Sequence, residues 1–342
     1  MADGGIMKIG VLGAGSWGIA LTVLLTGNGH DLTVWSIDKN EIDMLNEYRE
    51  HKTKLPGVKL SDSVKFTTDV SEAVDGAEML VMVVPSPFIR STAKTIAPYV
   101  KSNQIIVNVS KGIEESTLMT LTEVISDEIP DAKVGVLSGP SHAEEVGKCM
   151  PTTVVAGAEE KEIALLIQDT FMSDYFRVYT SPDVIGIELG GALKNVIALA
   201  AGIADGLGCG DNAKAALITR GISEIARLGT TMGGHAATFA GLSGIGDLIV
   251  TCASEHSRNR RAGYLMGQGK TYKEAMDEVK MVVEGVYSAK AALMLSRKYN
   301  IVMPIVEMVN KILFEDFDTN EAMIALLTRM RTSESSDLIW EN

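Results

Sequence analysis

KIGVLGAGSWG, residues 8–18, joins a short apolar run to a glycine-rich turn, and the helix-forming stretch IALTVLLTGNG (residues 19–29) follows it. Gly13, Gly15 and Gly18 have the spacing GxGxxG. In a strand–turn–helix unit the first glycine permits a tight turn, the second lets a pyrophosphate approach the backbone, and the third lets helix and strand pack closely. The helix N-terminus then offers its N–H groups to the anion. This context favours a bound dinucleotide over a glycine turn without a ligand.

The first half of the chain alternates short β-rich runs with segments of helical periodicity. The expected strands are residues 8–12, 32–35, 64–67, 79–84, 104–110 and 133–139. Strand 152–158, helix 159–172 and strand 176–180 are expected to extend the same sheet. Strands that are apolar on both faces and separated by helices predict a parallel sheet covered on both sides, which crossover handedness makes doubly wound.

After Pro182 the pattern becomes mostly helical, with long alanine, leucine and isoleucine stretches broken by glycine. The sequence therefore predicts an α/β fold, in which an N-terminal doubly wound Rossmann-type sheet domain (residues 7–184) precedes an all-α C-terminal domain (residues 185–335). A ligand cleft is expected between the two domains.

Composition narrows the class of partner. The chain has 342 residues and a formal net charge of −13, and this field opposes binding to nucleic acid and to anionic membranes. A phosphate ligand must then be small and held by a local cationic pocket. Three widely spaced cysteines fit reduced thiols, and the five histidines lack metal-ligand spacing, so no metal is expected. No signal peptide and no apolar run near the ~20 residues of a membrane span are expected, which favours a cytoplasmic protein without membrane insertion.

Several polar residues call for an explanation. Lys111 follows an expected strand, Gly139, Ser141 and His142 follow the next, Asp247 stands in an apolar run, and residues 257–261 read SRNRR. Each alone has an ordinary explanation: a solvated loop lysine, a structural histidine, a helix cap or a solvated helix face. Lys194 is harder to explain, because it lies between GGAL and VIALAAG, where burial is expected and an ammonium needs a partner.

Taken together, eight motifs in unbroken order resemble those of the bacterial NAD(P)-dependent glycerol-3-phosphate dehydrogenases. They are GAGSWG (13–18), NVSKGIE (108–114), SGPSHAEE (138–145), GGALKNVIALAAGIADG (190–206), NAKAALITRG (212–221), GLSGIGDLIVTC (241–252), SRNRR (257–261) and VVEG (282–285). The resemblance runs from about residue 8 to about residue 330. It implies hydride transfer at C2 between sn-glycerol 3-phosphate and dihydroxyacetone phosphate, supply of glycerol 3-phosphate for glycerophospholipid synthesis, and a homodimer.

The resemblance also implies roles for residues. Lys194 falls on the family's proton acceptor, and Lys111 and Asp247 join it as the predicted catalytic group. The substrate positions are Lys111, Gly139, Ser141, Lys194, Asn195, Asp247, Ser257, Arg258 and Asn259. The cofactor positions that the resemblance implies are Ser16, Trp17, Lys111, Ala143, Arg258, Val282 and Glu284. The glycine motif adds Gly13, Gly15 and Gly18, and the spacing after it adds Asp38. Two of these keep a second interpretation: Trp17 as packing, and Asn195 as a residue that holds the helix start.

The residue types suit this chemistry. Oxidation of a secondary alcohol needs a base for the hydroxyl proton. A lysine, with an unperturbed pKa of roughly 10.4, can serve if burial and a neighbouring cation such as Lys111 lower that pKa, while Asp247 opposes the shift. Arg258, with Asn259 and Ser257 beside it, offers the several donors that a phosphate needs.

The choice between NAD and NADP is open, with NAD favoured. Asp38 lies about 20 residues beyond the glycines, where an acid commonly binds the ribose 2′-hydroxyl, or it caps the next helix. Relatives that prefer NADPH usually carry arginine or histidine where this chain has Ile37 and then Asp38. Lys54 and Arg49 remain as cations that could reach the pocket.

Two other functions would share part of this pattern. A β-hydroxyacid or 6-phosphogluconate-type dehydrogenase would share the two-domain plan, but SRNRR with GIGDLIVTC suits a small phosphate substrate better than a carboxylate. A sensor that binds NADH without turnover would need only the binding fold. The joint presence of Lys194, Lys111 and Asp247 speaks against the sensor.

Overall fold

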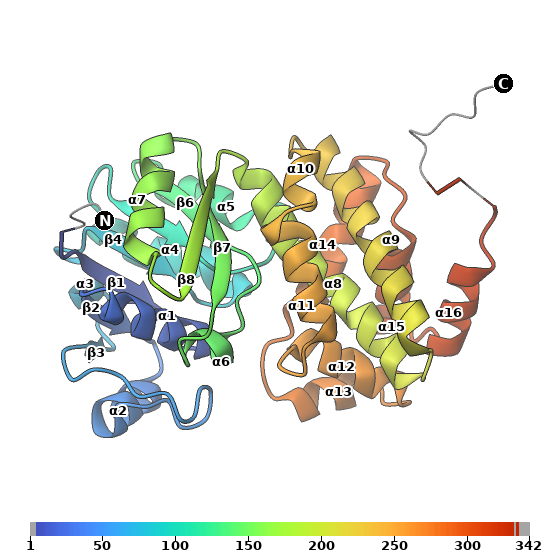
Figure 1. Cartoon of the computed structure of the whole chain (residues 1–342), viewed down its shortest axis with the longest axis horizontal. Coiled ribbons are helices and arrows are strands. Elements are labelled where there is room, and N and C mark those ends of the chain that lie inside the picture. The colour runs from blue at the N-terminus through green and yellow to red at the C-terminus, as the bar shows by residue number, and fades with distance from the viewer. Residues whose placement is uncertain (1–4, 332, 335–342) are drawn as a thin grey trace.

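An eight-stranded sheet and a set of helices form two lobes that lie side by side (Figure 1). The computed structural model describes residues 5–331, 333 and 334. The strands are β1 (Lys8–Leu12), β2 (Asp31–Trp35), β3 (Lys65–Thr67), β4 (Met79–Met82), β5 (Ile105–Asn108), β6 (Lys133–Ser138), β7 (Thr152–Ala158) and β8 (Phe176–Ser181). Their order in the sheet is β3-β2-β1-β4-β5-β6-β7-β8.

All neighbouring strands are parallel except β6 and β7, where Leu137 lies opposite Ala156 in an antiparallel pair. The expectation of a wholly parallel sheet was therefore wrong at this point. Two parallel strands need a crossover connection that returns over one face of the sheet, and this connection is usually an α-helix. Between β6 and β7 the chain forms only the short helix α6 (Ala143–Val146), which lies against α1 (Ser16–Gly27), so β7 returns in the opposite direction.

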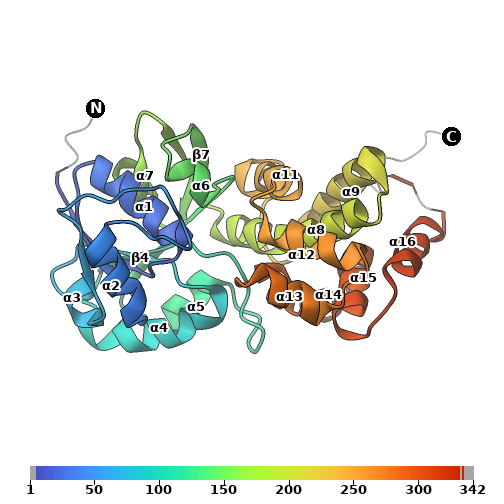
Figure 2. The same cartoon turned by 90° about the horizontal axis from the view of Figure 1, so that it is seen from below.

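The sheet is buried on both faces because its side chains alternate. Met79 and Val81 of β4 join one apolar cluster, and Leu80 and Met82 join another. Figure 2 shows α1 and α7 on one side of the sheet and α4 and α5 on the other. Three of these helices are α4 (Ile89–Ile96), α5 (Leu121–Glu128) and α7 (Lys161–Phe171), and the lobe also contains α2 (Lys39–Tyr48) and α3 (Val70–Val74).

The second lobe is built around α8 (Val184–Gly206), which runs from the sheet lobe into the helices (Figure 1). The other helices of this lobe are α9 (Gly210–Thr231), α10 (Ala236–Phe239), α11 (Asp247–Ala253), α12 (Arg258–Gly267), α13 (Tyr272–Val279), α14 (Glu284–Lys298), α15 (Pro304–Phe314) and α16 (Thr319–Leu327). Glycines allow the close packing: a Cβ at Gly202 would lie 2.1 Å from the Arg260 carbonyl oxygen, and one at Gly263 would lie 2.1 Å from that of Leu199.

The apolar character of α8 corrects one expectation. Residues 184–206 are long and apolar enough to cross a membrane, and so is the stretch 236–253, although no such run was expected. In α8, 89% of the apolar window is buried inside the protein. A helix that is apolar all round is stable in this position because neighbouring helices cover every side of it.

The fold class is confirmed, since a mostly parallel doubly wound sheet is followed by an all-α region. Strand β8 ends at Ser181 and α8 begins at Val184, while the limits 7–184 and 185–335 stay a prediction. Residue 335 lies outside the described part of the chain.

Candidate active site between the two lobes

Two lysines from different lobes share the carboxylate of Asp247. Lys194 Nζ on α8 donates to Asp247 Oδ1 at 2.7 Å, and Lys111 Nζ, three residues past β5, donates to Asp247 Oδ2 at 2.6 Å. Asp247 is 1% exposed and Lys194 is 6% exposed. Lys111 also donates to the Gly139 carbonyl oxygen at 3.0 Å, which ties it to the end of β6. The predicted catalytic residues therefore meet at the boundary between the lobes.

Local structure holds each member of this group. Asp247 begins α11, and Thr251 one turn later donates its hydroxyl to the Asp247 carbonyl oxygen at 2.6 Å. Lys194 Nζ donates to the same hydroxyl oxygen at 2.6 Å. An ammonium has three N–H groups. Lys194 thus keeps one N–H without a partner among the described residues.

The electrostatics favour a lysine that can lose its proton. Burial is the largest influence and lowers the Lys194 pKa, Asp247 raises it, and Lys111 lowers it again, so that the pKa lies at about 8. Burial raises the pKa of Asp247, but Lys111 and Lys194 outweigh it and hold the pKa below its usual value. The three groups carry one net positive charge when both lysines are protonated, which suits an anionic ligand.

The predicted substrate residues of the helical lobe form a second hydrogen-bonded group. Asn259 Nδ2 on α12 donates to Asn195 Oδ1 on α8 at 2.9 Å, and Asn259 Oδ1 accepts from the Gly285 N–H at 2.8 Å. Ser257 caps α12 and Arg258 follows it. On the sheet side Ser141 Oγ donates to the Gly139 carbonyl oxygen at 2.9 Å.

The two lobes also approach closely at Gly191, one turn before Asn195. A Cβ on Gly191 would lie 2.9 Å from Ser138 Oγ and 3.6 Å from Lys111 Cγ. Ser138 Oγ itself is buried and has no hydrogen-bond partner in the described part of the chain. A larger residue at position 191 would press on the Ser138 side chain at the end of β6.

The glycine-rich turn fits a dinucleotide. Gly13 has φ of +129°, and a Cβ on Gly18 would lie 2.1 Å from the Gly13 carbonyl oxygen, so both positions require glycine. At Gly15 a Cβ would meet nothing within 4 Å, so space is open in front of the turn. Gly15 is also the N-cap of α1, and no side chain caps this helix. Its first N–H groups can therefore receive a pyrophosphate.

The other predicted cofactor residues lie around this turn and across from it. Ser16 is the first residue of α1, and Trp17 Nε1 donates to the Val109 carbonyl oxygen at 3.2 Å, beside the segment that bears Lys111. Ala143 begins α6, which lies against α1. Asp38 is exposed and caps α2, where its Oδ1 accepts from the Asn40 N–H at 2.9 Å.

In the helical lobe, Arg258 Nη1 donates to the Val282 carbonyl oxygen at 2.9 Å. Glu284, at the start of α14, accepts from the backbone N–H of Ser86 at 3.2 Å and from the Ser86 hydroxyl. Ser86 follows β4, so this carboxylate joins the two lobes close to the glycine-rich turn.

Sequence reasoning missed Thr251 and Ser86. Thr251 stands four residues after Asp247, a spacing that places both on one face of a helix and could have indicated it. Ser86 had no local signal, because its partner Glu284 lies 198 residues away. His142 is partly buried, and burial together with Lys194 and Lys111 lowers its pKa, which favours the neutral imidazole.

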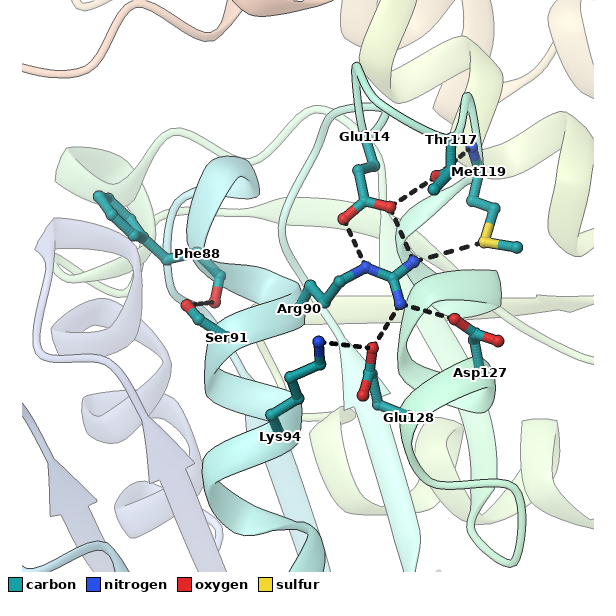
Figure 3. A network of polar contacts seen from close by, with 9 residues as sticks. All are labelled: Phe88, Arg90, Ser91, Lys94, Glu114, Thr117, Met119, Asp127 and Glu128. Carbon is teal, nitrogen blue, oxygen red and sulfur yellow. Dashed lines mark hydrogen bonds and ion pairs between the residues drawn. The ribbon is translucent and has the colours of Figure 1, made fainter.

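Arg90 supports the segment that carries Lys111. Figure 3 shows its guanidinium between the carboxylates of Glu114, Asp127 and Glu128. Both contacts to Glu114 measure 2.7 Å, and the contact to Asp127 measures 2.6 Å. Glu114 lies three residues beyond Lys111, and Ile113 between them is buried in the core of the helical lobe. The segment is thus held by both lobes.

The chain is similar to known glycerol-3-phosphate dehydrogenases over nearly its whole length. Residues 8–164 match the profile described as the N-terminus of NAD-dependent glycerol-3-phosphate dehydrogenase, and residues 183–324 match the profile of its C-terminus. A glycerol-3-phosphate dehydrogenase (NAD(P)+) of Agathobacter rectalis is 61% identical over 98% of this chain and 99% of its own length. One from Fusobacterium nucleatum is 59% identical over 96% of this chain and 99% of its own.

The fold agrees as well. The crystal structure of glycerol-3-phosphate dehydrogenase from Coxiella burnetii superimposes with a TM-score of 0.92 at 35% identity, over 95% of this chain and 99% of that one. The chain therefore belongs to the NAD-dependent glycerol-3-phosphate dehydrogenase family.

Proposed function

We propose that this enzyme interconverts sn-glycerol 3-phosphate and dihydroxyacetone phosphate, that Lys194 is its proton acceptor and donor, and that it supplies glycerol 3-phosphate for glycerophospholipid synthesis. The observation that carries the proposal is the pairing of Lys194 and Lys111, from opposite lobes, on the buried carboxylate of Asp247. A bound nicotinamide dinucleotide supplies or accepts the hydride.

Lys194 can hold the proton in both directions. Neutral Lys194 accepts the proton of the C2 hydroxyl with its nitrogen lone pair. This lone pair lies at the third position around Nζ, because Asp247 and Thr251 occupy the other two. Charged Lys194 returns that proton to the ketone oxygen and polarises it beforehand. Asp247 and Thr251 fix the direction of the amine, and Lys111 adds a second positive charge near the reacting oxygen.

Arg258, Ser257 and Asn259 are proposed to hold the substrate phosphate. They come together at the first turn of α12, where the helix N-terminus also favours an anion. A guanidinium is always charged and presents several N–H groups in a plane. Gly139, Ser141 and Asn195 are proposed to complete the substrate site, and Val282, Glu284 and Ala143 to contact the cofactor.

NAD is proposed as the preferred cofactor, although the relatives from Agathobacter rectalis and Fusobacterium nucleatum are named for both dinucleotides. Ile37, which is 85% exposed, and Asp38 follow β2, and neither offers a cation to a 2′-phosphate. A homodimer in the cytoplasm is proposed as the working form. Light scattering after size-exclusion chromatography tests the dimer, and a mass of about one chain would contradict it.

Loss of turnover without loss of cofactor binding tests the role of Lys194. We expect Lys194→Ala to lower kcat by at least about 100-fold, because a positioned base contributes on that order. NADH oxidation with dihydroxyacetone phosphate measures kcat, and titration calorimetry measures NADH binding. Lys273→Ala, a change of an exposed lysine on α13, is the control and should keep full activity. A wild-type kcat in Lys194→Ala would remove Lys194 from this role, and the absence of any turnover by the wild type would favour a sensor.

A further inference from the structure

A buried glutamate stands at the end of β2, next to the glycine-rich turn. Glu41, in the first turn of α2, is 8% exposed and accepts a hydrogen bond from Ser36 Oγ at 2.7 Å. Ser36 directly follows Trp35, whose carbonyl oxygen accepts from the Gly13 N–H at 2.9 Å. In doubly wound folds the end of the second strand receives the adenosine ribose of a dinucleotide. The Glu41 carboxylate therefore lies at the edge of that subsite.

Lys54 reaches this place from a later segment and is already paired there. Its ammonium contacts Glu41 Oε1, and its side chain is 40% exposed. His51 Nε2 lies 3.3 Å from the same oxygen and is 1% exposed. Arg49, the other cation that could have reached the subsite, instead donates to the Val64 carbonyl oxygen at 2.7 Å.

Every lysine and arginine between residues 36 and 60 has a carboxylate partner. Lys39 pairs with Asp43, Arg49 with Asp62, Lys54 with Glu41, and both Lys52 and Lys59 pair with Glu50. Asp38 adds a further negative charge at the end of the strand. A phosphate that enters here must displace a carboxylate before it gains a cation, whereas a hydroxyl does not need one.

We infer that Glu41 is a specificity-determining residue: it occupies Lys54 and adds a negative charge beside Asp38, and so favours the 2′-hydroxyl of NAD over the 2′-phosphate of NADP. The inference rests on the proposed function, because it concerns the cofactor of that reaction. Burial raises the pKa of Glu41, but hydrogen bonds from His51, Lys54 and Ser36 outweigh it and bring the pKa to about 2. Glu41 is thus charged at every pH at which the enzyme would work.

Glu41→Gln tests the inference by binding. Glutamine can still accept from Ser36, but it carries no charge and leaves the Lys54 ammonium to a phosphate. We expect the Kd for NADP+, measured by titration calorimetry, to fall by at least about tenfold, which corresponds to roughly 1.4 kcal/mol. The Kd for NAD+ should stay within about threefold of wild type, since its hydroxyl gains no new ion pair. In the double variant Glu41→Gln/Lys54→Met the gain for NADP+ should disappear.

Glu50→Gln is the matched control. Glu50 is 7% exposed, its pKa is also lowered to about 2, and it too holds lysines, but its contacts go to Lys52, Lys59 and the Gly57 N–H. The ratio of the two Kd values should not change in this variant. Lys54→Met alone serves if Glu41→Gln does not fold. It leaves the Glu41 charge unpaired and should weaken NADP+ binding by about tenfold without affecting NAD+.

An unchanged ratio of Kd values in both Glu41→Gln and Lys54→Met would overturn the inference. An equal change in Glu50→Gln would overturn it too, as would tighter binding of NADP+ than of NAD+ by the wild type. Failure of the proposed function looks different: both dinucleotides bind, but the wild type oxidises no NADH when dihydroxyacetone phosphate is added.

Discussion

Lys194 shows how a charged side chain is held in an apolar helix. Its neighbours on α8 are small or apolar, and the side chain is 7% exposed. Desolvation of an ammonium costs free energy, which Asp247 and Thr251 offset through short hydrogen bonds. The balance leaves a lysine whose pKa of about 8 is close to physiological pH.

This pKa predicts opposite pH dependences for the two directions of the reaction. Oxidation of sn-glycerol 3-phosphate needs neutral Lys194, so its kcat/KM should rise as pH passes about 8 and level off above it. Reduction of dihydroxyacetone phosphate needs charged Lys194, so its kcat/KM should fall over the same range.

In Asp247→Asn the charge that raises the Lys194 pKa is gone, and the midpoint of the pH profile for the residual activity should move to lower pH. A midpoint that moves upward would contradict the assignment.

Arg258 is the residue proposed to hold the substrate phosphate. We expect Arg258→Ala to raise KM for dihydroxyacetone phosphate by about tenfold or more, because a charge-assisted hydrogen bond to phosphate contributes roughly 1.5–3 kcal/mol. Steady-state kinetics measure the effect. Arg261→Ala, three residues further along the same helix and exposed to solvent, should leave KM unchanged. Equal effects of the two variants would count against phosphate recognition by Arg258.

The segment between β5 and α5 links the two lobes. It carries Lys111, it buries Ile113 among the helices, and Glu115 pairs with Lys290 of α14 at 3.6 Å. The Arg90 contacts to Glu114 hold it against α4 and α5 (Figure 3). A segment with so many anchors can keep the Lys111 ammonium at a fixed distance from Asp247.

Arg90→Met should loosen this segment. Loss of the paired hydrogen bonds to Glu114 should lower the free energy of unfolding in urea by about 2 kcal/mol and should also lower kcat/KM, because Lys111 loses its support. Lys94→Met is the control, since Lys94 is 62% exposed and, within the described part of the chain, pairs only with Glu128, at 3.6 Å. It should change the free energy of unfolding by less than about 0.5 kcal/mol. If Arg90→Met lowered stability but left kcat/KM at the wild-type value, Arg90 would support the fold without positioning Lys111.

For the whole molecule, the decisive contact joins α8 to the sheet lobe through Glu188. This carboxylate is 5% exposed and accepts from Asn108 Nδ2 at 3.1 Å and from the Thr122 N–H at 3.0 Å. Asn108 also donates to the Ser110 carbonyl oxygen, next to Lys111. The contact thus links the helix that carries Lys194 to the strand end that precedes Lys111.

Removal of this contact should uncouple the lobes. Glu188→Ala leaves the Thr122 N–H and one N–H of the Asn108 amide buried without an acceptor, which costs about 1–3 kcal/mol for each. We expect a lower Tm and a broadened or split transition in differential scanning calorimetry. Glu188→Gln keeps one oxygen acceptor and should show a smaller loss. An unchanged single transition in Glu188→Ala would mean that the lobes are coupled elsewhere.

The amino-acid sequence alone determined the run of strands and helices and the glycine-rich turn, and it indicated most of the polar residues of the proposed site. Those features depend on periodicity and steric demands within a few residues, as in the match between the expected strand 8–12 and β1. Only the tertiary structure decided that β7 runs antiparallel, that Asp38 caps α2, that Lys54 is paired with Glu41, and that Thr251 and Ser86 belong to the site. Lys111 and Asp247 lie 136 residues apart, and Lys194 and Asp247 lie 53 apart. Which carboxylate neutralises which ammonium over such separations depends on how whole elements pack, because the free energy of a buried charge is set by the groups that surround it in space.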